Sequence, residues 1–519
     1  MILADLKDAF VLDKPSGVAT HTPDGGVTDG FIEMASRLME RPLWAVHRLD
    51  KDTSGCLLVT DSAQNVDSWT QRLGVGKKKY VFVTPKKGKE GVWSNEGRIE
   101  KTGNHQFGLV DGESNSHTSF AYMGPCPQGF LYEAEISTGK THQIRIHAQA
   151  SGIPILGDAE HGGAPFHRLM LHAKELQLNG RKITSPLPKI FEIKTGSSAS
   201  PHDLAKFICS LDRRRFLMNF LKDETNAFRI VHREWSKTGK PRLCIEKLGD
   251  ILQVLHYSRN RLDKSFLSEL SEIVGTPHWF VREMFDRGKE VTDTNILQSS
   301  GNLPLQWFIF ENKMKLDLRY NQGLSSGIFL DQRKNRRRIL HESQGKRVAN
   351  LFSYTCGFSV AAALGGAHEV VSVDTSGASL EWGKNNFRIN HLDPEKYEFF
   401  VADAQFFLRS CTKRQRKFDT IILDPPTFSR SKNAQFKLVD DLPNLLDLAF
   451  DCLAPKGCLL ITTNDENITF DQLAVAIETS VDRTFKQMVK MERCLPPFDF
   501  EFPLERESVV KGYWVTREF

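Results

Sequence analysis

The chain of 519 residues contains no long apolar run and nothing that is typical of an export signal. A membrane-spanning helix needs about 18 to 20 consecutive apolar residues, whereas here the hydrophobic residues (40%) are dispersed among charged ones (26%). The first residues, MILADLKDAF, place acids where a signal peptide has a basic and then a long apolar segment. We therefore expect a cytoplasmic protein that has no membrane partner.

Cysteine pairs with metal-ligand spacing are also absent. The nine cysteines are odd in number, are scattered, and never occur as Cys-x-x-Cys. A disulfide framework and a structural zinc site are therefore not expected, and the sequence predicts no other metal site. It also contains no internal repeat, no low-complexity segment and no sign of an obligate protein partner.

Positive charge is modest overall but concentrated in places. A net charge of +5 is small for this length, yet Lys and Arg cluster at 76–89, 212–216, 332–338 and 413–417. Contacts to nucleic-acid phosphates need such local density. Each cluster by itself is typical of a solvated helix face, so the four together favour a nucleic-acid partner without establishing one.

Length and local composition divide the chain into three expected domains. At about 150 residues per domain this length gives three, and the small, polar stretch KTGSSASPHD (194–203) is typical of a linker. Strand-like runs dominate before it, namely KKYVFVT (78–84), FLYEAEIST (130–138) and QIRIHA (143–148). Residues 1–194 are therefore expected to form an α+β domain with a mixed or antiparallel sheet.

The middle segment, 204–320, predicts a small α+β domain. Apolar residues recur at helical spacing in LAKFICSLDRRRFLMNFL and again near 261–273. Gly249-Asp250 separates two apolar runs as a hairpin turn. The segment NKMKLDLRY alternates strictly and predicts a strand, whose apolar face would carry Met314, Leu316, Leu318 and Tyr320.

From 321 to 519 the pattern alternates between helix and strand. A helix over 331–345 would be closed by Gly345, and FSVAAALGG predicts a second helix. Between helices lie the β-rich runs KRVANLFSY, HEVVSVD, FDTIILDPP and GCLLITT. Buried β-rich runs that alternate with helices predict an α/β domain with a doubly wound parallel sheet.

Acidic residues follow the predicted strands of this sheet, where open parallel sheets bind ligands. Asp374 follows the second strand and suits the two hydroxyls of a ribose, and Asp403 is placed to accept from an adenine amine. The first loop, NLFSYTCG, is not a G-x-G-x-x-G, which a dinucleotide pyrophosphate would need. S-adenosylmethionine has no phosphate, so we expect it as the cofactor, although each acid alone is equally typical of a helix cap.

The stretch LDPPTF follows another strand and would form the reacting end of this site. Two prolines fix the chain directly after Asp424, which gives a rigid rim beside a methyl donor. Phe428 could stack on a base there. The alternative is a proline-stiffened loop with a core phenylalanine.

Most of 220–519 resembles the RlmI/RlmK-type 23S ribosomal RNA methyltransferases. The matching stretches are DETNAFRIVHRE, GIFLDQRKNRRRI, NLFSYTCGFSVAAALGGA, SVDTS, LDPPTFSRSK and VVKGYWV. The resemblance implies catalysis at Asp424 and RNA contacts from Arg336, Arg337, Arg338 and Phe428. It also implies a donor site made of Asp331, Arg333, Asn350, Phe352, Ser353, Tyr354, Gly357, Asp374, Asp403, Asp424, Pro425 and Pro426.

One feature departs from the members that methylate carbon 5 of cytosine. Those members need a nucleophilic cysteine after the DPP strand or after the next strand, but the latter reads ITTNDENI, with Thr462, Thr463 and Asn464. Cys458 lies at the start of that strand and is expected in the core. A guanine ring nitrogen is therefore the expected acceptor, since its lone pair needs orientation and no covalent intermediate. 5-Methylcytidine remains the alternative product.

The N-terminal segment contains HRLDKDTSG (47–55), which alone is ordinary turn and helix-cap chemistry. Other unusual stretches accompany it in order: VLDKPSGVATH, KKKYVFV, EISTGKTHQIRIHAQASGIPILGDAEHGG and LMLHAKELQL. Together they resemble the RluA-type pseudouridine synthases over nearly all of 9–192, and HRLDKDTSG matches that family's catalytic motif residue by residue.

This second resemblance implies that Asp50 is the catalytic carboxylate. Uracil can leave as an anion, so one carboxylate suffices where a glycosidase uses two; Asp50 would attack the sugar carbon or remove a sugar proton. Arg145 would pair with Asp50, Arg48 would bind a phosphate or brace the loop, and Tyr80 would stack on the uracil and pass its proton. The target nucleotide must be turned out of its stack, and no cofactor is expected.

The sequence thus predicts one bifunctional RNA-modifying enzyme, with a pseudouridine synthase followed by an S-adenosylmethionine-dependent methyltransferase. The expected partner is RNA: 23S rRNA for both halves, with transfer RNA also open for the uridine substrate. The main alternative is a single active half whose companion serves only to bind RNA.

Overall fold

The computed structural model describes most of the chain, in two compact units. The described residues are 2–22, 30–103, 106–192, 201–232, 243–257, 261–284, 296–322, 325–430, 435–465, 467–484, 489–494, 496–500 and 510–518. One unit contains 1–222 with 261–273, and the other contains 223–260 with 274–519. The expected three-domain division is finer than this and stays a prediction, and residues 194–200 of the predicted linker lie outside the described residues. No described helix is long and apolar enough to cross a membrane.

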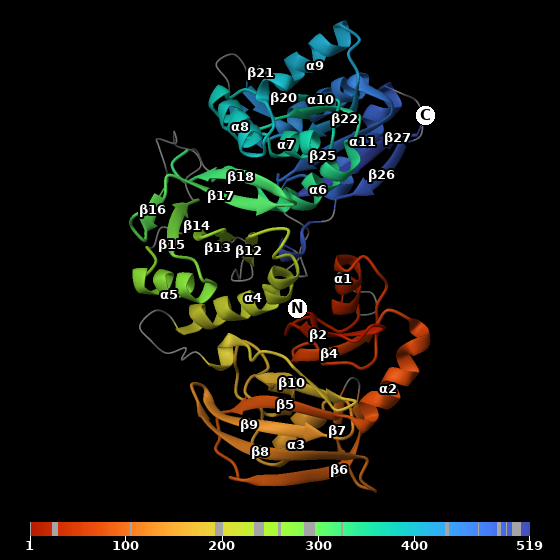
Figure 1. Cartoon of the computed structure of the whole chain (residues 1–519), viewed down its shortest axis with the longest axis vertical. Helices are drawn as coiled ribbons and strands as arrows, with labels where there is room; N and C mark the ends of the chain where they lie inside the picture. Colours follow the sequence, from red (N-terminus) through yellow and green to blue (C-terminus); the bar gives the residue numbers. More distant parts are fainter. Residues whose placement is uncertain are drawn as a thin grey trace. The chain divides into compact units, whose positions relative to one another are not determined.

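The first unit is built on one mixed sheet with the strand order β1-β2-β4-β10-β5-β9-β8-β6-β7 (Figure 1). Neighbouring strands along this path are antiparallel except for the parallel pair β4 and β10, and β11 and β3 add to β10 and β4. The strands are β1 (Ile2–Asp5), β2 (Ala9–Lys14), β3 (Trp44–Ala45), β4 (Ser54–Thr60), β5 (Lys77–Thr84), β6 (Val92–Gly103), β7 (Gln106–Val110), β8 (Ser116–Cys126), β9 (Gly129–Ile136), β10 (Leu171–Leu178) and β11 (Arg181–Thr184). The mixed sheet confirms the fold class predicted for this part.

The helices of this unit are α1 (Phe31–Leu38), α2 (Val66–Val75), α3 (Gln143–Ala150), α4 (Pro201–Phe220) and most of α5 (Lys264–Val274). The helix α3 corrects one prediction, because QIRIHA was expected to be a strand. Its two isoleucines alternate with polar residues, but every residue from Gln143 to Ala148 is buried. A helix that is buried on all sides has no exposed face, so hydrophobic periodicity cannot identify it.

The second unit begins with a sheet in the order β12-β13-β14-β15-β16. Its strands are β12 (Ala227–His232), β13 (Leu243–Leu248), β14 (Ile251–His256), β15 (His278–Glu283) and β16 (Ile296–Ser299). The predicted hairpin is confirmed, since Gly249 has a φ of 63° between β13 and β14. A second hairpin joins β17 (Gln306–Glu311) to β18 (Met314–Arg319), where Met314, Leu316 and Leu318 are buried as predicted.

The predicted doubly wound sheet is confirmed, with the order β21-β20-β19-β22-β25-β27-β26. Its first five strands are parallel, and β27 is antiparallel to both β25 and β26. The strands are β19 (Arg347–Leu351), β20 (Glu369–Asp374), β21 (Glu398–Val401), β22 (Phe418–Leu423), β25 (Leu453–Thr463), β26 (Val489–Arg493) and β27 (Lys511–Arg517). A short hairpin of β23 (Phe428–Arg430) and β24 (Gln435–Lys437) follows β22. The chain order reverses between β19 and β22, which makes this the switch point where such sheets bind ligands.

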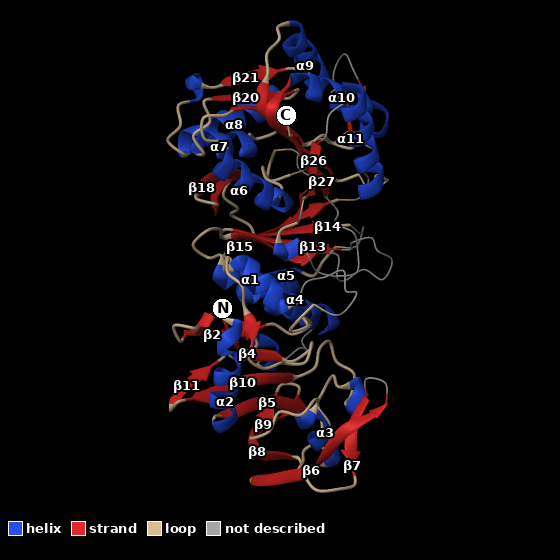
Figure 2. Ribbon diagram, turned by 90° about the vertical axis from the view of Figure 1, so that its right-hand side faces the viewer, coloured by secondary structure: helices blue, strands red, loops and turns tan. Residues whose placement is uncertain are grey.

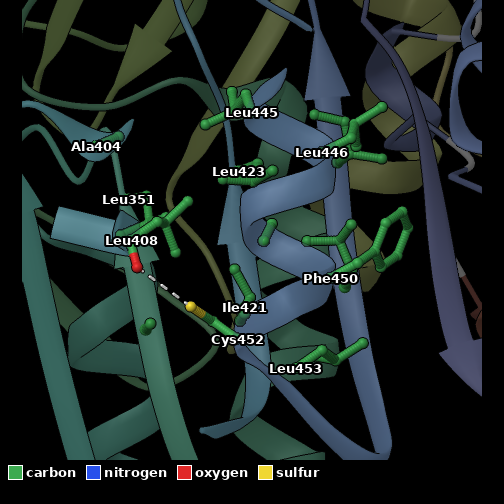
Figure 3. Close-up of a cluster of buried hydrophobic side chains, with 14 of the residues drawn as sticks. Leu351, Ala404, Leu408, Ile421, Leu423, Leu445, Leu446, Phe450, Cys452 and Leu453 are labelled. Carbon is green, nitrogen blue, oxygen red and sulfur yellow. Dashed lines mark hydrogen bonds between the residues drawn. The ribbon is translucent and has the colours of Figure 1, made fainter. Parts of the chain in front are cut away.

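Helices cover both faces of this sheet (Figure 2). They are α6 (Arg333–Glu342), α7 (Gly357–Leu364), α8 (Gly377–Ile389), α9 (Ala404–Lys413), α10 (Leu438–Cys452) and α11 (Phe470–Thr484). Residues of α7 and α8 pack in one apolar core, and residues of α9, α10 and α11 pack in another. Figure 3 shows part of the second core, where Leu445, Leu446 and Phe450 of α10 lie beside the strand that carries Ile421 and Leu423. Both cores fix the strand ends that carry the site.

Candidate active sites

The loop that carries Asp50 is held in place by the segment after β2. Lys14 is fully buried, and its ammonium donates to the carbonyls of Pro15, Val18 and Lys51 at 2.9, 2.7 and 3.1 Å. Thr20 accepts from the backbone N–H of Leu49 and donates to its carbonyl. Burial lowers the pKa of Lys14 to about 7. The stretches VLDKPSGVATH and HRLDKDTSG therefore form one structural element, which fixes the backbone on both sides of Asp50.

Asp50 faces the guanidinium of Arg145, with 3.5 Å between Oδ2 and Nη1. Arg145 is buried in α3, and its Nε and Nη2 donate to the two carboxylate oxygens of Asp158 at 2.8 and 2.7 Å. Its Nη2 also donates to Glu160 at 2.6 Å. These carboxylates raise the pKa of Arg145 above its ordinary value despite burial. A permanent positive charge, held rigidly by Asp158, thus stands opposite the carboxylate of Asp50.

Histidines complete the surroundings of Asp50. His142 precedes α3 with a φ of 57°, and its Nε2 lies 4.0 Å from Asp50 Oδ2. Its Nδ1 lies 3.1 Å from Nε2 of His161, which ends the short 3-10 helix Ala159–His161. His142, Asp158 and Glu160 lie in the stretch 135–163 that resembles the synthase family, but none of them was predicted as a site residue. Their common signal was the density of charged and imidazole groups in 135–163.

Tyr80 and Arg48 differ in their accessibility. Tyr80 lies in β5 and is 7% exposed; burial first, and then the charge of Asp50, raise the pKa of its phenol above the ordinary value. It is therefore protonated at neutral pH. Arg48 is exposed and lies two residues before Asp50. The structure thus brings Asp50 and Arg145 together, places Tyr80 within electrostatic reach, and leaves Arg48 on the surface.

A cavity of about 310 Å³ lies at the switch point of the parallel sheet. It is lined by residues of the loop after β19, the ends of β20 and β22, and the segment before α6. Of the residues predicted to bind the donor, ten line it: Asp331, Phe352, Ser353, Tyr354, Gly357, Asp374, Asp403, Asp424, Pro425 and Pro426. Strand ends far apart in sequence therefore converge on one hollow.

The acids of this cavity are held by backbone groups. Asp374 accepts from the N–H of Tyr354 and from that of Ser376, both at 2.8 Å. Asp403 accepts from the N–H of Phe406 at 3.1 Å as the cap of α9, and it lines the cavity as well. The helix-cap alternative and the ligand-contact alternative therefore do not exclude one another at Asp403.

Asp424 and Asp331 also line the cavity and lie near each other. Asp424 accepts from Thr462 Oγ1 at 2.6 Å and from Gln332 Nε2 at 3.1 Å. Asp331 has a buried Oδ1 without a hydrogen-bond partner. Burial, and next the charge of Asp424, raise the pKa of Asp331 to about 6. Two neighbouring carboxylates with an unsatisfied oxygen mark a place that favours a positively charged ligand.

Two residues that were predicted to bind the donor do not line the cavity. Arg333 donates to Asp499 and to the carbonyl of Ala227 at 3.0 and 2.6 Å, which directs it away from the hollow. Asn350 is buried in β19 and donates to Ser359. The prediction that these two residues contact the donor directly is therefore corrected, because neither lines the cavity. Their hydrogen bonds instead fix α6 and α7.

The predicted arginine cluster is also divided by the fold. Arg336 is 3% exposed, forms a bidentate pair with Glu311 at 2.6 and 2.9 Å, and lines the cavity. The prediction that it contacts an RNA phosphate at the surface is therefore corrected. Arg338 is half-buried against Glu342 and Glu492. Arg337 is 41% exposed and lies 3.7 Å from Glu224. The side chain of Phe428 lies outside the described residues.

Sequence reasoning also missed part of the cavity wall. Gln332 and Phe329 line it, as does Asn464, which the sequence singled out only for its place after the strand; Asn464 accepts from Thr427 at 3.2 Å. Gln332 lies in the stretch GIFLDQRKNRRRI, between Asp331 and Arg333, which were the two residues of that stretch predicted to bind the donor. Cys458 is buried and accepts from Thr516, as expected for a core residue. No cysteine is among the described residues that line the cavity.

The fold and these two sites define the class of the protein as an enzyme with two catalytic domains. The family model described as S-adenosylmethionine-dependent methyltransferase matches residues 269–503, and the model described as RNA pseudouridylate synthase matches residues 8–150. The chain belongs to the S-adenosylmethionine-dependent methyltransferases, because it also covers 72% of a 32% identical methyltransferase relative, and the match at residues 8–150 marks an RNA pseudouridylate synthase domain before that part. Both resemblances seen in the sequence are confirmed.

Known relatives cover parts of the chain. The ribosomal RNA large subunit methyltransferase K/L of Shewanella oneidensis is 37% identical over 59% of this chain, which spans 42% of that protein. A putative ribosomal RNA large subunit methyltransferase of Bacillus subtilis is 32% identical over 54% of this chain and 72% of its own length. The chain thus spans less than half of the first relative.

Two solved structures share the fold. A putative methyltransferase in complex with S-adenosylhomocysteine has a TM-score of 0.51 and 23% identity, over 70% of this chain and 89% of its own. A putative methyltransferase from Streptococcus mutans has a TM-score of 0.50 and 24% identity, over 66% and 86%. At these identities the likeness establishes the fold alone.

Proposed function

We propose that the chain is a bifunctional enzyme that isomerises uridine to pseudouridine and methylates a base of 23S rRNA. The observation that carries this proposal is that each unit has its own complete set of reactive groups. Asp50 stands opposite Arg145 in the first unit, and a cavity lined by carboxylates lies at the switch point of the second.

In the synthase half, Asp50 is the reacting carboxylate. Arg145 pairs with it and orients it, and Asp158 keeps Arg145 in place. The charged form is needed whether Asp50 attacks the sugar carbon or removes a sugar proton. Tyr80 is a protonated phenol that can donate to the freed uracil, and the exposed Arg48 can bind the phosphate of the flipped nucleotide. No group in this arrangement calls for a cofactor.

The cavity of the second unit fits S-adenosylmethionine by the chemistry of its wall. Asp374 suits a ribose diol, and Asp403 suits an amine hydrogen. The unpartnered oxygen of Asp331 and the neighbouring Asp424 suit the positive charges of this donor. S-adenosylmethionine supplies the methyl group when bound, and the residues of the chain orient it and keep water out. Asp424, with Pro425 and Pro426, forms the rim at which the acceptor base would arrive.

The absence of cysteine from the described cavity wall favours a nitrogen acceptor. Carbon-5 methylation of cytosine needs a thiolate beside the donor, whereas Cys458 is in the core. Asn464 and Thr427 offer an amide and a hydroxyl at the rim, groups that read base edges by hydrogen bonds. A ring nitrogen of guanine is therefore the proposed acceptor.

The names of the relatives support ribosomal RNA of the large subunit as the substrate. For the uridine substrate of the first unit, transfer RNA is the alternative. The test is to map pseudouridine and methyl marks on 23S rRNA and transfer RNA from cells with and without this gene, and with Asp50→Asn or Asp374→Ala restored. Cells without the gene should lack one pseudouridine and one methylguanine. Asp374→Ala should restore only the pseudouridine, and Asp50→Asn should restore only the methylguanine. Loss of only one mark would mean that the other unit only binds RNA, and loss of 5-methylcytidine would overturn the acceptor.

A further inference from the structure

The surroundings of Asp50 contain a group of side chains that the synthase reaction does not use. His142, Glu160 and His161 each offer one ligand atom, and these atoms all lie within 4.8 Å of one another. His142 Nδ1 is 3.1 Å from His161 Nε2 and 3.6 Å from Glu160 Oε2. A zinc ion with bonds of about 2.0–2.2 Å has tetrahedral ligand edges of about 3.4 Å. Both separations from His142 Nδ1 are close to that value before any ion is present, and the third pair of ligand atoms lies within 4.8 Å.

The elements that carry these ligands are fixed. His161 ends a short 3-10 helix that is capped by Asp158, whose Oδ1 accepts from the His161 N–H at 3.2 Å. His142 is held in a left-handed conformation before α3, with its ring against that of His161 at 5.2 Å. Binding an ion would therefore require little rearrangement, apart from releasing Glu160 from Arg145. Arg145 would keep its two bonds to Asp158.

The other nitrogen of His142 connects this group to the catalytic carboxylate. His142 Nε2 lies 4.0 Å from Asp50 Oδ2. Histidines that bind a metal through one nitrogen commonly donate the other N–H to a carboxylate. An ion on Nδ1 would fix the tautomer that carries its hydrogen on Nε2, directed at Asp50. Asp50 would then accept a hydrogen bond next to a doubly charged ion, which makes it a poorer nucleophile and a poorer base.

We propose that His142, Glu160 and His161 form a site for a divalent transition-metal ion such as Zn²⁺, and that the bound ion represses the pseudouridine synthase. Two imidazoles and one carboxylate select such ions over Mg²⁺ or Ca²⁺, which prefer oxygen ligands. Glu160 is 64% exposed and gives the ion a path from solvent. The repression, but not the metal site, rests on the proposed function.

The binding test uses the full chain, freed of metal by a chelator, in a Cys126→Ser background because Cys126 is the one free cysteine that is not buried. Titration with Co²⁺ should give the visible absorption bands of a tetrahedral ion at one equivalent, and Zn²⁺ should remove them. His161→Gln and Glu160→Gln should each weaken binding at least 10-fold. His21→Gln is the matched control, because His21 pairs with Glu33 at 3.4 Å in the same unit and, within the described part of the chain, belongs to no group of three ligands. Absent bands, or bands unchanged in both variants, would overturn the site.

The activity test separates repression from the proposed function. One equivalent of Zn²⁺ should reduce pseudouridine formation at least 10-fold, leave methylation unchanged, and have no effect on His161→Gln. Equal inhibition of wild type and His161→Gln would overturn the repression. A metal-free chain that forms no pseudouridine would count against the proposed function, while the Co²⁺ spectrum would still decide the metal site.

Discussion

The two sites of this chain use carboxylates in opposite ways. In the first unit, Asp50 stands beside a side chain of opposite charge, and Arg145, Asp158 and Glu160 fill the surroundings with ion pairs. In the second unit, Asp374 and Asp403 are held by backbone N–H groups, and their remaining lone pairs face an open cavity. The first arrangement suits a residue that is itself the reagent. The second suits residues that hold a reagent brought from outside.

The difference also appears in the protonation of the acids. Arg145 supplies Asp50 with a built-in counter-charge. Asp331 instead has an oxygen without a partner and a pKa raised to about 6 by burial and by Asp424. Arg229 and Arg336 act on Asp331 only partly against burial and the charge of Asp424, so its unpartnered oxygen is available to a cationic ligand, whereas Asp50 already faces Arg145. Mutations and pH should therefore affect the two units independently.

The largest effect is expected for Asp50→Asn, which keeps the shape and removes the charge. Pseudouridine formation should fall by more than about 10³-fold, since neither sugar attack nor proton removal remains possible. Methylation should stay within a factor of two of wild type. Both products can be counted from one reaction on protein-free 23S RNA with saturating donor. If a folded Asp50→Asn protein also failed to methylate, the two units would act in obligatory order.

Asp374→Ala should have the reverse effect. Removing the carboxylate that we propose to bind the ribose should weaken donor binding by about 2–3 kcal/mol, the upper part of the range for hydrogen bonds to a charged group, which corresponds to about 30- to 150-fold. Calorimetric titration with S-adenosylmethionine measures the change, with pseudouridine formation as the internal control. Equal donor affinity in the variant and wild type would remove Asp374 from the site.

Much of the fold could be predicted because its signals are local. Gly249-Asp250 between apolar runs predicts its own hairpin, and the β-rich runs around Asn350 and Ile421 need only their neighbours in sequence to be recognised as buried strands. The acids Asp374 and Asp424 could be placed because strand ends meet at one edge of a parallel sheet. The helix α3 could not, because burial on all sides removes the period that identifies a helix.

The errors in the site have a different cause. In RKNRRR, the sequence does not indicate which arginines turn inward, because their partners Glu311 and Asp499 are remote in sequence. Arg333 and Arg336 are one turn apart on the buried face of α6, and Arg337 lies on the exposed face. Likewise, His142 and Glu160 approach one another only after α3 and the following turn have formed. Sequence patterns therefore do not predict contacts between charged residues that lie in distant segments of the chain.

Lys14→Met would test whether the loop around Asp50 depends on its buried ammonium. Three carbonyls would lose their donor, so the free energy of unfolding of the first unit should fall by about 1–3 kcal/mol, the cost of leaving buried acceptors unpaired. Pseudouridine formation should fall with it, while methylation should not. Chemical denaturation followed by near-ultraviolet circular dichroism measures stability. The exposed Lys101→Met is the control, and equal stability of both variants would contradict the bracing role.

The pH dependence of donor binding should distinguish the second site from the first. Asp331 has a folded-state pKa raised to about 6, so it ionises between pH 5 and 7. If its charged form binds the cationic donor, affinity should rise about 10-fold over that range, and Asp331→Asn should abolish the rise. The stability of the ligand-free protein should change in the opposite direction. The folded state holds the proton of Asp331 more tightly than the unfolded state, so the free energy of unfolding falls as pH rises from about 4 to 6. A pH-independent affinity in the wild type would remove Asp331 from the charge recognition.

The smallest effect is expected at the surface of α6, where the arginine cluster divides. The side chain of Arg337 is 41% exposed beside Glu224 and can be reached by a phosphate from solvent, whereas Arg336 is paired with Glu311 inside the fold. Each phosphate contact with single-stranded RNA contributes about 0.7 to the slope of log affinity against log salt. Arg337→Gln should lower the slope by about that amount and weaken binding equally for all sequences, as measured by filter binding between 50 and 200 mM salt. Arg336→Gln should leave the slope unchanged and lower the melting temperature, because it strands the buried carboxylate of Glu311. A slope that is unchanged in Arg337→Gln would place the RNA interface elsewhere than on this face of α6.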